Sequence, residues 1–369
     1  MDTREWLVVN ALPGVGPHRI AELVARQPQW PEGWLAALPS KAASALRLWY
    51  EHPSKSPLQR AVEASLAWQS NAPGRTILHR DHPAWSPLLN QIADPPAVLW
   101  AQGDLSALER PTLAMVGTRR PTAEGAHNAK TFARELARRG WCIVSGMALG
   151  VDGVAQQAAL DAGGSSVAVL GCGIDVIYPA RHRALYQQLS DSPGGLVLAE
   201  HPPGTVAHPA FFPRRNRIVT GLSLGTLVVE AAEKSGSLVS ARLAMEQGRD
   251  VFALPSSLHN QQARGCLQLL RQGAAMACEP EDIVNELQHW ASEFLPPPMA
   301  DLSAASSMPA DEPLPDALLG LLGASPTPID ALVQQSGSSV SECQQRLLML
   351  EIDGWVASRA GGWVRLPRP

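Results

Sequence analysis

The fold is decided by the stretch Thr112-Leu113-Ala114-Met115-Val116-Gly117-Thr118-Arg119-Arg120-Pro121, in which a short apolar run ends at a glycine and two arginines. The following segment, Thr122–Arg139, places its alanines at the i, i+3, i+4 spacing of an amphipathic helix. A second apolar run, Trp141–Ser145, then ends at another glycine. Short buried strands that alternate with amphipathic helices are typical of a parallel α/β sheet.

The same alternation continues on both sides of this stretch. Further short, apolar and β-rich runs are Ala97–Ala101, Ser166–Leu170, Leu196–Ala199, Leu227–Ala231 and Val251–Leu254. Helical segments such as Ser237–Gln247 lie between most of them. The sequence therefore predicts an α/β fold built on a parallel sheet.

The turns after these strands are where function is expected, because ligands of parallel sheets bind beyond the carboxyl ends of the strands. Glycine-rich turns begin at Gly117, Gly146 and Gly171. Glycine lets a backbone approach a ligand closely, and the helix that follows offers unpaired N–H groups to an anion. Such turns also serve packing alone. Their combination with Arg119, Arg214, Arg215 and Arg217 favours phosphate binding.

Arginines are concentrated in the stretch Phe211-Phe212-Pro213-Arg214-Arg215-Asn216-Arg217-Ile218. Guanidinium groups bind phosphate oxygens as planar forks, and aromatic rings outside the core stack on bases. The alternative is that Phe211 and Phe212 belong to the core and that the arginines pair with local carboxylates. The glycine-rich turns favour an anion site beside a stacking surface.

Composition excludes several classes of protein. The 369 residues allow about two or three domains, and 30 Lys+Arg against 34 Asp+Glu leave a formal charge of −4, so any nucleic-acid binding must be local. Five scattered cysteines without a C-x-x-C pair argue against a disulfide framework and a Cys-based zinc site. We expect a reducing, cytoplasmic location, since neither a signal peptide nor a membrane span is evident.

Composition also divides the chain. Residues 1–70 carry several tryptophans and Leu12-Pro13-Gly14-Val15-Gly16, which suits either a helix-hairpin-helix phosphate contact or a plain helical turn. Residues 71–290 hold the predicted sheet. Residues 291–315 are rich in Pro, Ala and Ser and predict a linker. Residues 316–369 predict a winged helix, with helices at Ala317–Leu322, Ile329–Gln335 and Val340–Ile352 and a hairpin around Gly361-Gly362.

The helix that would read DNA in a winged helix, Ser339–Ile352, has Glu342 and Glu351 but only one basic residue, Arg346. Such a helix repels a duplex backbone more than it attracts one. A protein-contact or accessory role is therefore expected for this domain, rather than that of a duplex-specific transcription factor.

Taken together, these motifs are similar to those of the DprA/Smf family, the bacterial DNA-processing proteins of natural transformation. The matching stretches are Gly117–Arg119, Ser145–Asp152, Gly171–Pro179, Phe212–Ile218, Glu230-Ala231 and Ser235–Leu238. They cover most of residues 77–287, and the two flanking segments look like the family's flanking domains. The sequence departs from the family pattern at Pro255-Ser256-Ser257 and at Gly265-Cys266-Leu267, which puts the local loop conformation in doubt.

The resemblance implies an extended Rossmann-like domain that binds single-stranded DNA, forms a homodimer and loads the recombinase RecA onto incoming strands. It implies a helical SAM-like or helix-hairpin-helix-like domain before the sheet and a winged helix after it. No catalytic residue, metal or cofactor is expected. Motif matching assigns phosphate or strand binding to Gly117, Thr118, Arg119, Ser145, Gly146, Phe212, Arg214, Asn216, Arg217, Ser235 and Ser237. Arg119 and Arg217 are expected to be the charge partners of the phosphates, with Phe212 against a base.

Two enzymatic alternatives remain open. Gly225-Thr226 with Glu230 superficially resembles the site of nucleoside monophosphate phosphoribohydrolases, but the glutamate lies four residues beyond the threonine and the preceding glycines are missing. A metal-dependent nuclease would use Asp152, Asp175, Glu200 and Glu230, which all follow strands. Helix capping by Asp152 and pairing of Glu230 with an arginine would explain these carboxylates structurally. The absence of a Walker motif argues against ATP-driven work.

Overall fold

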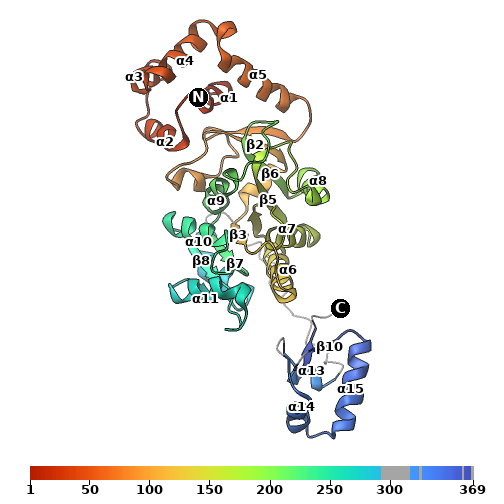
Figure 1. Ribbon diagram of the computed structural model, residues 1–369. Coiled ribbons are helices and arrows are strands. Elements are labelled where there is room, and N and C mark those ends of the chain that lie inside the picture. The colour runs from red at the N-terminus through yellow and green to blue at the C-terminus, as the bar shows by residue number, and fades with distance from the viewer. Residues whose placement is uncertain (292–315, 324–325, 360, 367–369) are drawn as a thin grey trace, which may run out of the picture. The chain divides into compact units, whose positions relative to one another are not determined.

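The computed structural model describes residues 1–291, 316–323, 326–359 and 361–366 (Figure 1). The chain divides into two compact units, Met1–Leu295 and Pro296–Pro369. Among the described residues, no helix is both long enough and apolar enough to cross a membrane. The predicted linker, residues 291–315, lies almost entirely outside the described residues.

A nine-stranded sheet forms the centre of the first unit. Its strands are β1 (Arg75–Leu78), β2 (Leu99–Gly103), β3 (Thr112–Val116), β4 (Cys142–Ser145), β5 (Ser165–Gly173), β6 (Gly195–His201), β7 (Gly225–Val228), β8 (Asp250–Ala253) and β9 (Ala275–Met276). Their order across the sheet is β1-β2-β6-β5-β4-β3-β7-β8-β9. The strands from β6 to β9 are parallel, whereas β2 pairs antiparallel with both β1 and β6.

This order places a topological switch point at β3. From β3 the chain moves through β4 and β5 to β6, and then crosses back to add β7 and β8 on the other side of β3. Loops that leave β3 and β7 therefore diverge in opposite directions and open a crevice between them. In open α/β sheets this crevice is the place where ligands bind. The Rossmann-like α/β fold predicted from the sequence is confirmed.

Helices cover both faces of the sheet because its central strands are buried on both sides. Helices α6 (Ala123–Arg138), α7 (Val151–Asp161) and α12 (Pro280–Ala291) pack on the face that holds Leu113 and Met115 of β3. Helices α9 (Phe211–Gly221), α10 (Ser237–Glu246) and α11 (Arg264–Arg271) pack on the opposite face, against Ala114 and Val116. Alternate residues of a strand point to opposite faces, so β3 is buried in two cores at once.

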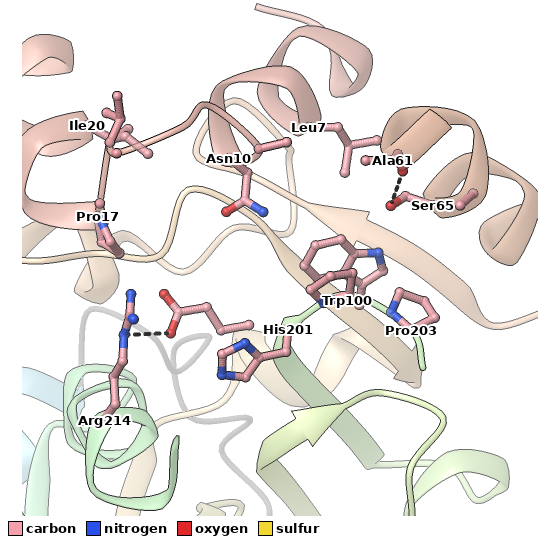
Figure 2. Close-up of a pocket in the computed structure, with 17 residues that line it drawn as sticks. Leu7, Asn10, Pro17, Ile20, Ala61, Ser65, Trp100, His201, Pro203 and Arg214 are labelled. Carbon is pink, nitrogen blue, oxygen red and sulfur yellow. Dashed lines mark hydrogen bonds and ion pairs between the residues drawn. The ribbon is translucent and has the colours of Figure 1, made fainter. Parts of the chain in front are cut away.

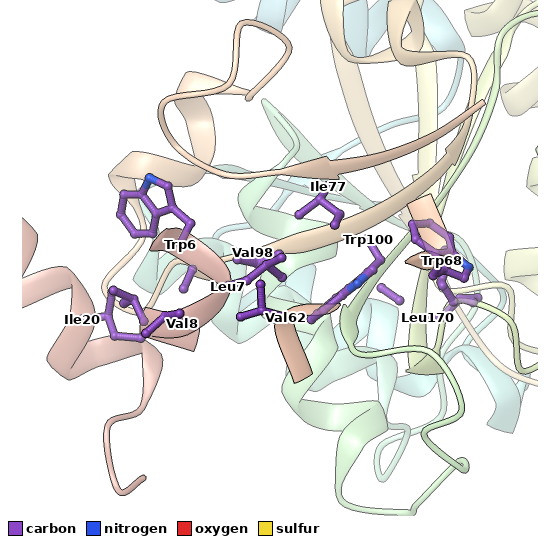
Figure 3. Close-up of a cluster of buried hydrophobic side chains, with 14 of the residues drawn as sticks. Trp6, Leu7, Val8, Ile20, Val62, Trp68, Ile77, Val98, Trp100 and Leu170 are labelled. Carbon is purple, nitrogen blue, oxygen red and sulfur yellow. The ribbon is translucent and has the colours of Figure 1, made fainter. Parts of the chain in front are cut away.

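Helices before the sheet share a core with it. These are α1 (Thr3–Asn10), α2 (Pro17–Ala25), α3 (Glu32–Ala37), α4 (Ser40–Glu51) and α5 (Pro57–Ser70). Trp6 of α1, Val62 and Trp68 of α5, Trp100 of β2 and Leu170 of β5 belong to one buried cluster (Figure 3). Helix α8 (Arg183–Asp191) contributes to the same cluster. Tryptophans of this region are therefore mostly core residues, as their sequence pattern predicts.

Single 3-10 turns complete this unit at Pro53–Lys55, Pro87–Gln91, Leu105–Glu109, Ala180–His182 and Gln261–Ala263. The second unit contains α13 (Leu318–Leu321), α14 (Ile329–Ser336), α15 (Val340–Ile352) and a hairpin of β10 (Val356–Arg359) and β11 (Gly362–Arg365). Three helices followed by a hairpin confirm the predicted winged helix. The finer domain boundaries, at residues 70/71 and 315/316, stay predictions.

Candidate nucleic-acid interface

A groove of about 530 Å³ lies at the carboxyl ends of the central strands, at the switch point of the sheet. The loops after β3, β4 and β7 form its walls, and the first turns of α9 and α10 close it. Seven of the eleven residues predicted for the site line this groove: Gly117, Arg119, Gly146, Phe212, Asn216, Ser235 and Ser237. The other four, Thr118, Ser145, Arg214 and Arg217, do not.

The loop after β3 holds Arg119 outward. Thr118 donates its backbone N–H to the Glu230 carbonyl at 2.7 Å and accepts the Val151 N–H at 3.2 Å, so the loop is fixed to the segment that follows β7 and to the start of α7. Arg119 is exposed, and among the described residues it has no hydrogen-bond or ion-pair partner. A guanidinium fixed at its base and unpaired at its tip is available to an anion.

Arg215 forms the floor of the groove, although the residues predicted for the site do not include it. Its Nη1 donates to the Gly146 carbonyl at 2.5 Å and to the Val169 carbonyl, and its Nε donates to Asn216 Oδ1 at 3.1 Å. The side chain is 6 % exposed. Among the described residues Nη2 has no hydrogen-bond partner, and Arg215 lines the groove.

Asp152 is the buried counter-charge of Arg215. Its Oδ2 accepts the backbone N–H groups of Gly146 at 3.1 Å and Ala148 at 3.4 Å, which fixes the loop after β4. Burial raises the pKa of Asp152, and the nearby Arg215 guanidinium opposes that rise. Asp152 therefore does not cap α7 as predicted, because the N-cap residue of this helix is Gly150. It stabilises the preceding loop instead.

Glycines of the site serve the packing of the chain as well as access. A side chain at Gly146 would overlap the Arg215 guanidinium, and one at Gly117 would come within 2.6 Å of Val151 Cγ2. Gly236 at the start of α10 differs, because a Cβ there would meet nothing within 4 Å and its φ is ordinary. The chain itself does not require a glycine at position 236, so open space above α10 remains for a ligand.

Two aromatic rings stand at the edge of the groove. Phe212 and Tyr178 lie with their ring centroids 5.1 Å apart, and both residues line the groove. Tyr178 was not among the predicted site residues, although it belongs to the glycine-rich turn after β5; it is 47 % exposed. Phe211 does not line the groove; its ring packs on that of His201, with the two ring centroids 4.0 Å apart. The aromatic surface of the groove is thus formed by Phe212 with Tyr178, and not by the Phe211–Phe212 pair of the sequence.

Arg217 has a different environment from that of Arg119. Its guanidinium binds both carboxylate oxygens of Glu200, at 2.5 and 3.0 Å, and donates from Nε to Asp94 Oδ2 at 2.8 Å. Arg217 and Glu200 are 4 % and 8 % exposed. The alternative of pairing with local carboxylates therefore holds for Arg217, which joins α9 to β6 and does not face the groove.

The four carboxylates considered as metal ligands all have protein partners. Glu230 accepts from the Thr122 N–H at 2.8 Å and from its hydroxyl at 2.7 Å, and not from an arginine as the sequence suggested. Asp175 accepts the Gly204 N–H at 2.7 Å. In the part of the chain that the structure describes, no group of three or more His, Cys, Asp or Glu side chains is arranged to hold a metal ion.

Comparison with known proteins then identifies the family. The family model for DNA recombination-mediator protein A matches residues 76–288, and the model for the DprA winged helix domain matches residues 302–362. The chain belongs to the DprA/Smf family. It is 39 % identical over 379 residues to protein Smf of Escherichia coli K12, covering all of this chain and 97 % of that protein.

Solved structures of DprA proteins agree with this assignment. The X-ray structure of DprA from Streptococcus pneumoniae has a TM-score of 0.66 at 29 % identity and covers 78 % of this chain and 98 % of that one. A DprA structure from Helicobacter pylori, described for its single-stranded DNA binding mode, has a TM-score of 0.52 at 34 % identity and covers 59 % and 97 %.

The two departures from the DprA pattern lie outside the groove. Cys266 is fully buried, with its Sγ 3.6 Å from the Val228 carbonyl, and a side chain at Gly265 would collide with the carbonyls of Ala231 and Ala232. Ser256 accepts from Asn260, whose amide also reaches Glu230. None of these residues lines the groove.

Proposed function

We propose that this DprA/Smf protein binds single-stranded DNA in the groove at the switch point of its sheet. One observation carries the proposal: the groove brings together two guanidinium groups and two aromatic rings. Arg119 is exposed and has no partner among the described residues, Arg215 is buried, and the rings are those of Phe212 and Tyr178. Guanidiniums attract phosphates without reading sequence, and rings accept bases of any kind. The single-stranded DNA binding mode described for the H. pylori relative supports this choice.

Within the proposed complex, each wall of the groove has its own role. Arg119 and the Nη2 of Arg215 bind phosphate oxygens from two sides, while Ser235, Ser237 and the N–H of Gly236 contact the backbone at the start of α10. Phe212 stacks on a base. Arg217 acts as a positioning residue, because its ion pairs with Glu200 and Asp94 hold α9 in place.

A role as recombination mediator extends this proposal to partners. We infer from family membership that the protein protects incoming strands in the cytoplasm, forms a homodimer through the Rossmann-like domain and loads RecA during transformation. The proposal requires no catalytic step, metal or cofactor. The phosphoribohydrolase alternative is weaker, since Glu230, its only candidate acid, is 2 % exposed and bound by Thr122.

Fluorescence anisotropy with a labelled single strand and its duplex, without metal or nucleotide, tests the proposal. The wild-type protein should prefer the single strand. Arg119→Ala should weaken binding to all sequences alike and reduce the slope of log affinity against log salt by about one unit. Arg120→Ala is the matched control, because Arg120 is also exposed but does not line the groove. Equal binding of duplex and single strand, or equal effects of the two substitutions, would refute the proposed site.

A further inference from the structure

A second cavity, of about 570 Å³, lies between the N-terminal helices and the end of β6 (Figure 2). Its walls come from α1, α2 and α5, its floor is Trp100 of β2, and its rim is the turn His201-Pro202-Pro203. Arg214 reaches into it from α9. None of the residues that line the groove lines this cavity, which we call the cleft.

The floor of the cleft contains an unsatisfied donor. Trp100 is 1 % exposed, and its Nε1 has no hydrogen-bond partner among the described residues. In Figure 2 the nitrogen edge of the indole is turned toward Ser65 and Pro203, which also line the cleft. The hydroxyl of Ser65 donates to the Ala61 carbonyl at 2.9 Å. Few buried donors in folded proteins lack an acceptor. Trp68 Nε1 is another such donor among the described residues, but Trp100 is the one that lines the cleft, where a ligand can supply the acceptor.

The opposite end of the cleft is suited to an anion. Helix α2 starts there at Pro17 without a side-chain cap, after Gly16. Gly16 has an ordinary φ of −92°, and a Cβ on it would meet nothing within 4 Å, so neither strain nor packing requires a glycine. The Arg214 side chain lies below Pro17 in Figure 2 and is 49 % exposed. Helix starts and guanidiniums both favour negative charge.

Arg214 is only loosely held by the protein. Its Nε is 3.8 Å from Glu200 Oε2, and both oxygens of that carboxylate are already bound by Arg217. A pair this long and this exposed contributes little. Arg214 can therefore turn to a ligand anion without breaking a strong contact.

The start of α9, from Phe211 to Asn216, separates the cleft from the groove, and its residues line one or the other. Arg214 lines the cleft, whereas Arg215 and Asn216 line the groove. Phe211 packs on His201 of the cleft rim, whereas Phe212 packs on Tyr178 at the groove. The groove and the cleft therefore lie on two sides of the start of α9.

We propose that the cleft is a second nucleotide subsite. It takes a phosphate between Arg214 and the start of α2, and a base against Trp100, His201 and Pro203, with a base carbonyl accepting from Trp100 Nε1. The nucleotide belongs to the single-stranded DNA that continues from the groove, so this proposal rests on the proposed function. A free mononucleotide has the same chemistry. An apolar peptide is disfavoured, because the exposed charge that Arg214 brings is positive and lies next to the groove.

Site-directed cross-linking tests the subsite in the full chain. Asn10 lines the cleft and Ser235 lines the groove, and Cys278 is the exposed cysteine of the described chain. Asn10→Cys and Ser235→Cys, each with Cys278→Ser, are mixed with oligothymidines that carry a thiol tether at one defined nucleotide. Each cysteine should form a disulfide with the tether at one preferred nucleotide, and the preferred nucleotides of the two cysteines should lie a few positions apart along the oligothymidine.

The outcomes separate the two proposals. Cross-linking at Ser235→Cys with none at Asn10→Cys, or with no position preference there, overturns the subsite and leaves the groove intact. Cross-linking at neither cysteine overturns the proposed function as well. Competition of the Asn10→Cys product by millimolar thymidine monophosphate would show that the cleft takes free nucleotides; absence of competition would show that it needs the strand.

Anisotropy provides an independent measurement. Arg214→Ala should weaken binding about tenfold for strands long enough to reach the cleft, the value of one charge-assisted hydrogen bond, and much less for strands that fill only the groove. Arg60→Ala, an exposed arginine on α5 that lines neither cavity, is the matched control. The same loss at every length overturns the subsite.

Discussion

Three arginines of one helix have three environments, and these environments set their roles. Arg214 is half exposed, Arg215 is buried under the groove, and Arg217 is buried in an ion-pair cluster. Successive residues of an α-helix are about 100° apart around its axis, so the phase of α9 against the sheet decides which guanidinium reaches which surface. The type of residue alone does not assign the role.

Arg217→Ala should destabilise the fold rather than remove a phosphate contact. Loss of its guanidinium leaves Glu200 as a buried, unpaired carboxylate, which costs about 3–5 kcal/mol in the free energy of unfolding. Urea unfolding followed by circular dichroism measures this loss. The double variant Arg217→Met/Glu200→Gln should recover much of it, because the unpaired charge is gone.

A stable Arg217→Ala protein that has lost DNA binding would contradict this assignment and return Arg217 to the site. Arg119→Ala supplies the contrast, because removal of an exposed, unpaired side chain should leave the urea midpoint unchanged. The two substitutions thus separate the loss of structure from the loss of a contact.

Sequence spacing predicts the residue types of the site but not the division of labour among them. The glycine turns at Gly117 and Gly146 and the ring of Phe212 lie in the groove, where their positions after the strands predict them. Arg217 and Arg215 could not be told apart, because burial of a guanidinium depends on carboxylates and carbonyls far along the chain. Glu200 and Asp94 are 17 and 123 residues from Arg217.

At the scale of elements, a substitution at the start of α10 tests how closely single-stranded DNA approaches this helix. Gly236→Ala adds one methyl group where nothing lies within 4 Å, so the free energy of unfolding should change by less than about 1 kcal/mol. Affinity for the single strand should fall severalfold, because the methyl occupies the space of a phosphate at Ser235 and Ser237. Anisotropy and thermal unfolding measure the two effects.

Gly320→Ala is the matched control for that substitution. Gly320 lies in α13 of the second unit, also with open space at its Cβ and no unusual φ. If both alanine variants bind the single strand as well as the wild type, the strand does not touch the start of α10.

Most elements of the sheet are predictable because their strands are buried on both faces. Thr112–Val116 is buried at all five positions and stands out as an apolar run. β1 begins with Arg75 and Thr76, and β9 has only two residues, so neither has a distinct pattern. The helix Phe211–Gly221 is hard to predict from the sequence, because Pro213 and the run of arginines give it no amphipathic pattern. Proline is nevertheless tolerated in the first turn of a helix.

For the whole molecule, charge distribution indicates which unit would bind DNA in the proposed function. Residues 316–369 hold five acidic and four basic side chains, and Arg346, the only basic residue of α15, donates from Nε to Asp316 at 2.7 Å. That bond lowers the pKa of Asp316. With its arginine paired, α15 has little left to attract a phosphate backbone.

Removal of residues 292–369 should therefore leave single-strand affinity within about twofold of the full chain, since few phosphate contacts are lost. The first unit has its own buried clusters on both faces of the sheet and contains the groove and the cleft. Anisotropy at two salt concentrations compares the two proteins, with circular dichroism as the control for folding. A loss of tenfold or more in a folded truncated protein, or a smaller salt slope, would show that the winged helix contacts DNA. Unchanged binding would instead direct the search for its role to protein partners, for which the exposed Leu348, Met349 and Ile352 of α15 are the first side chains to replace.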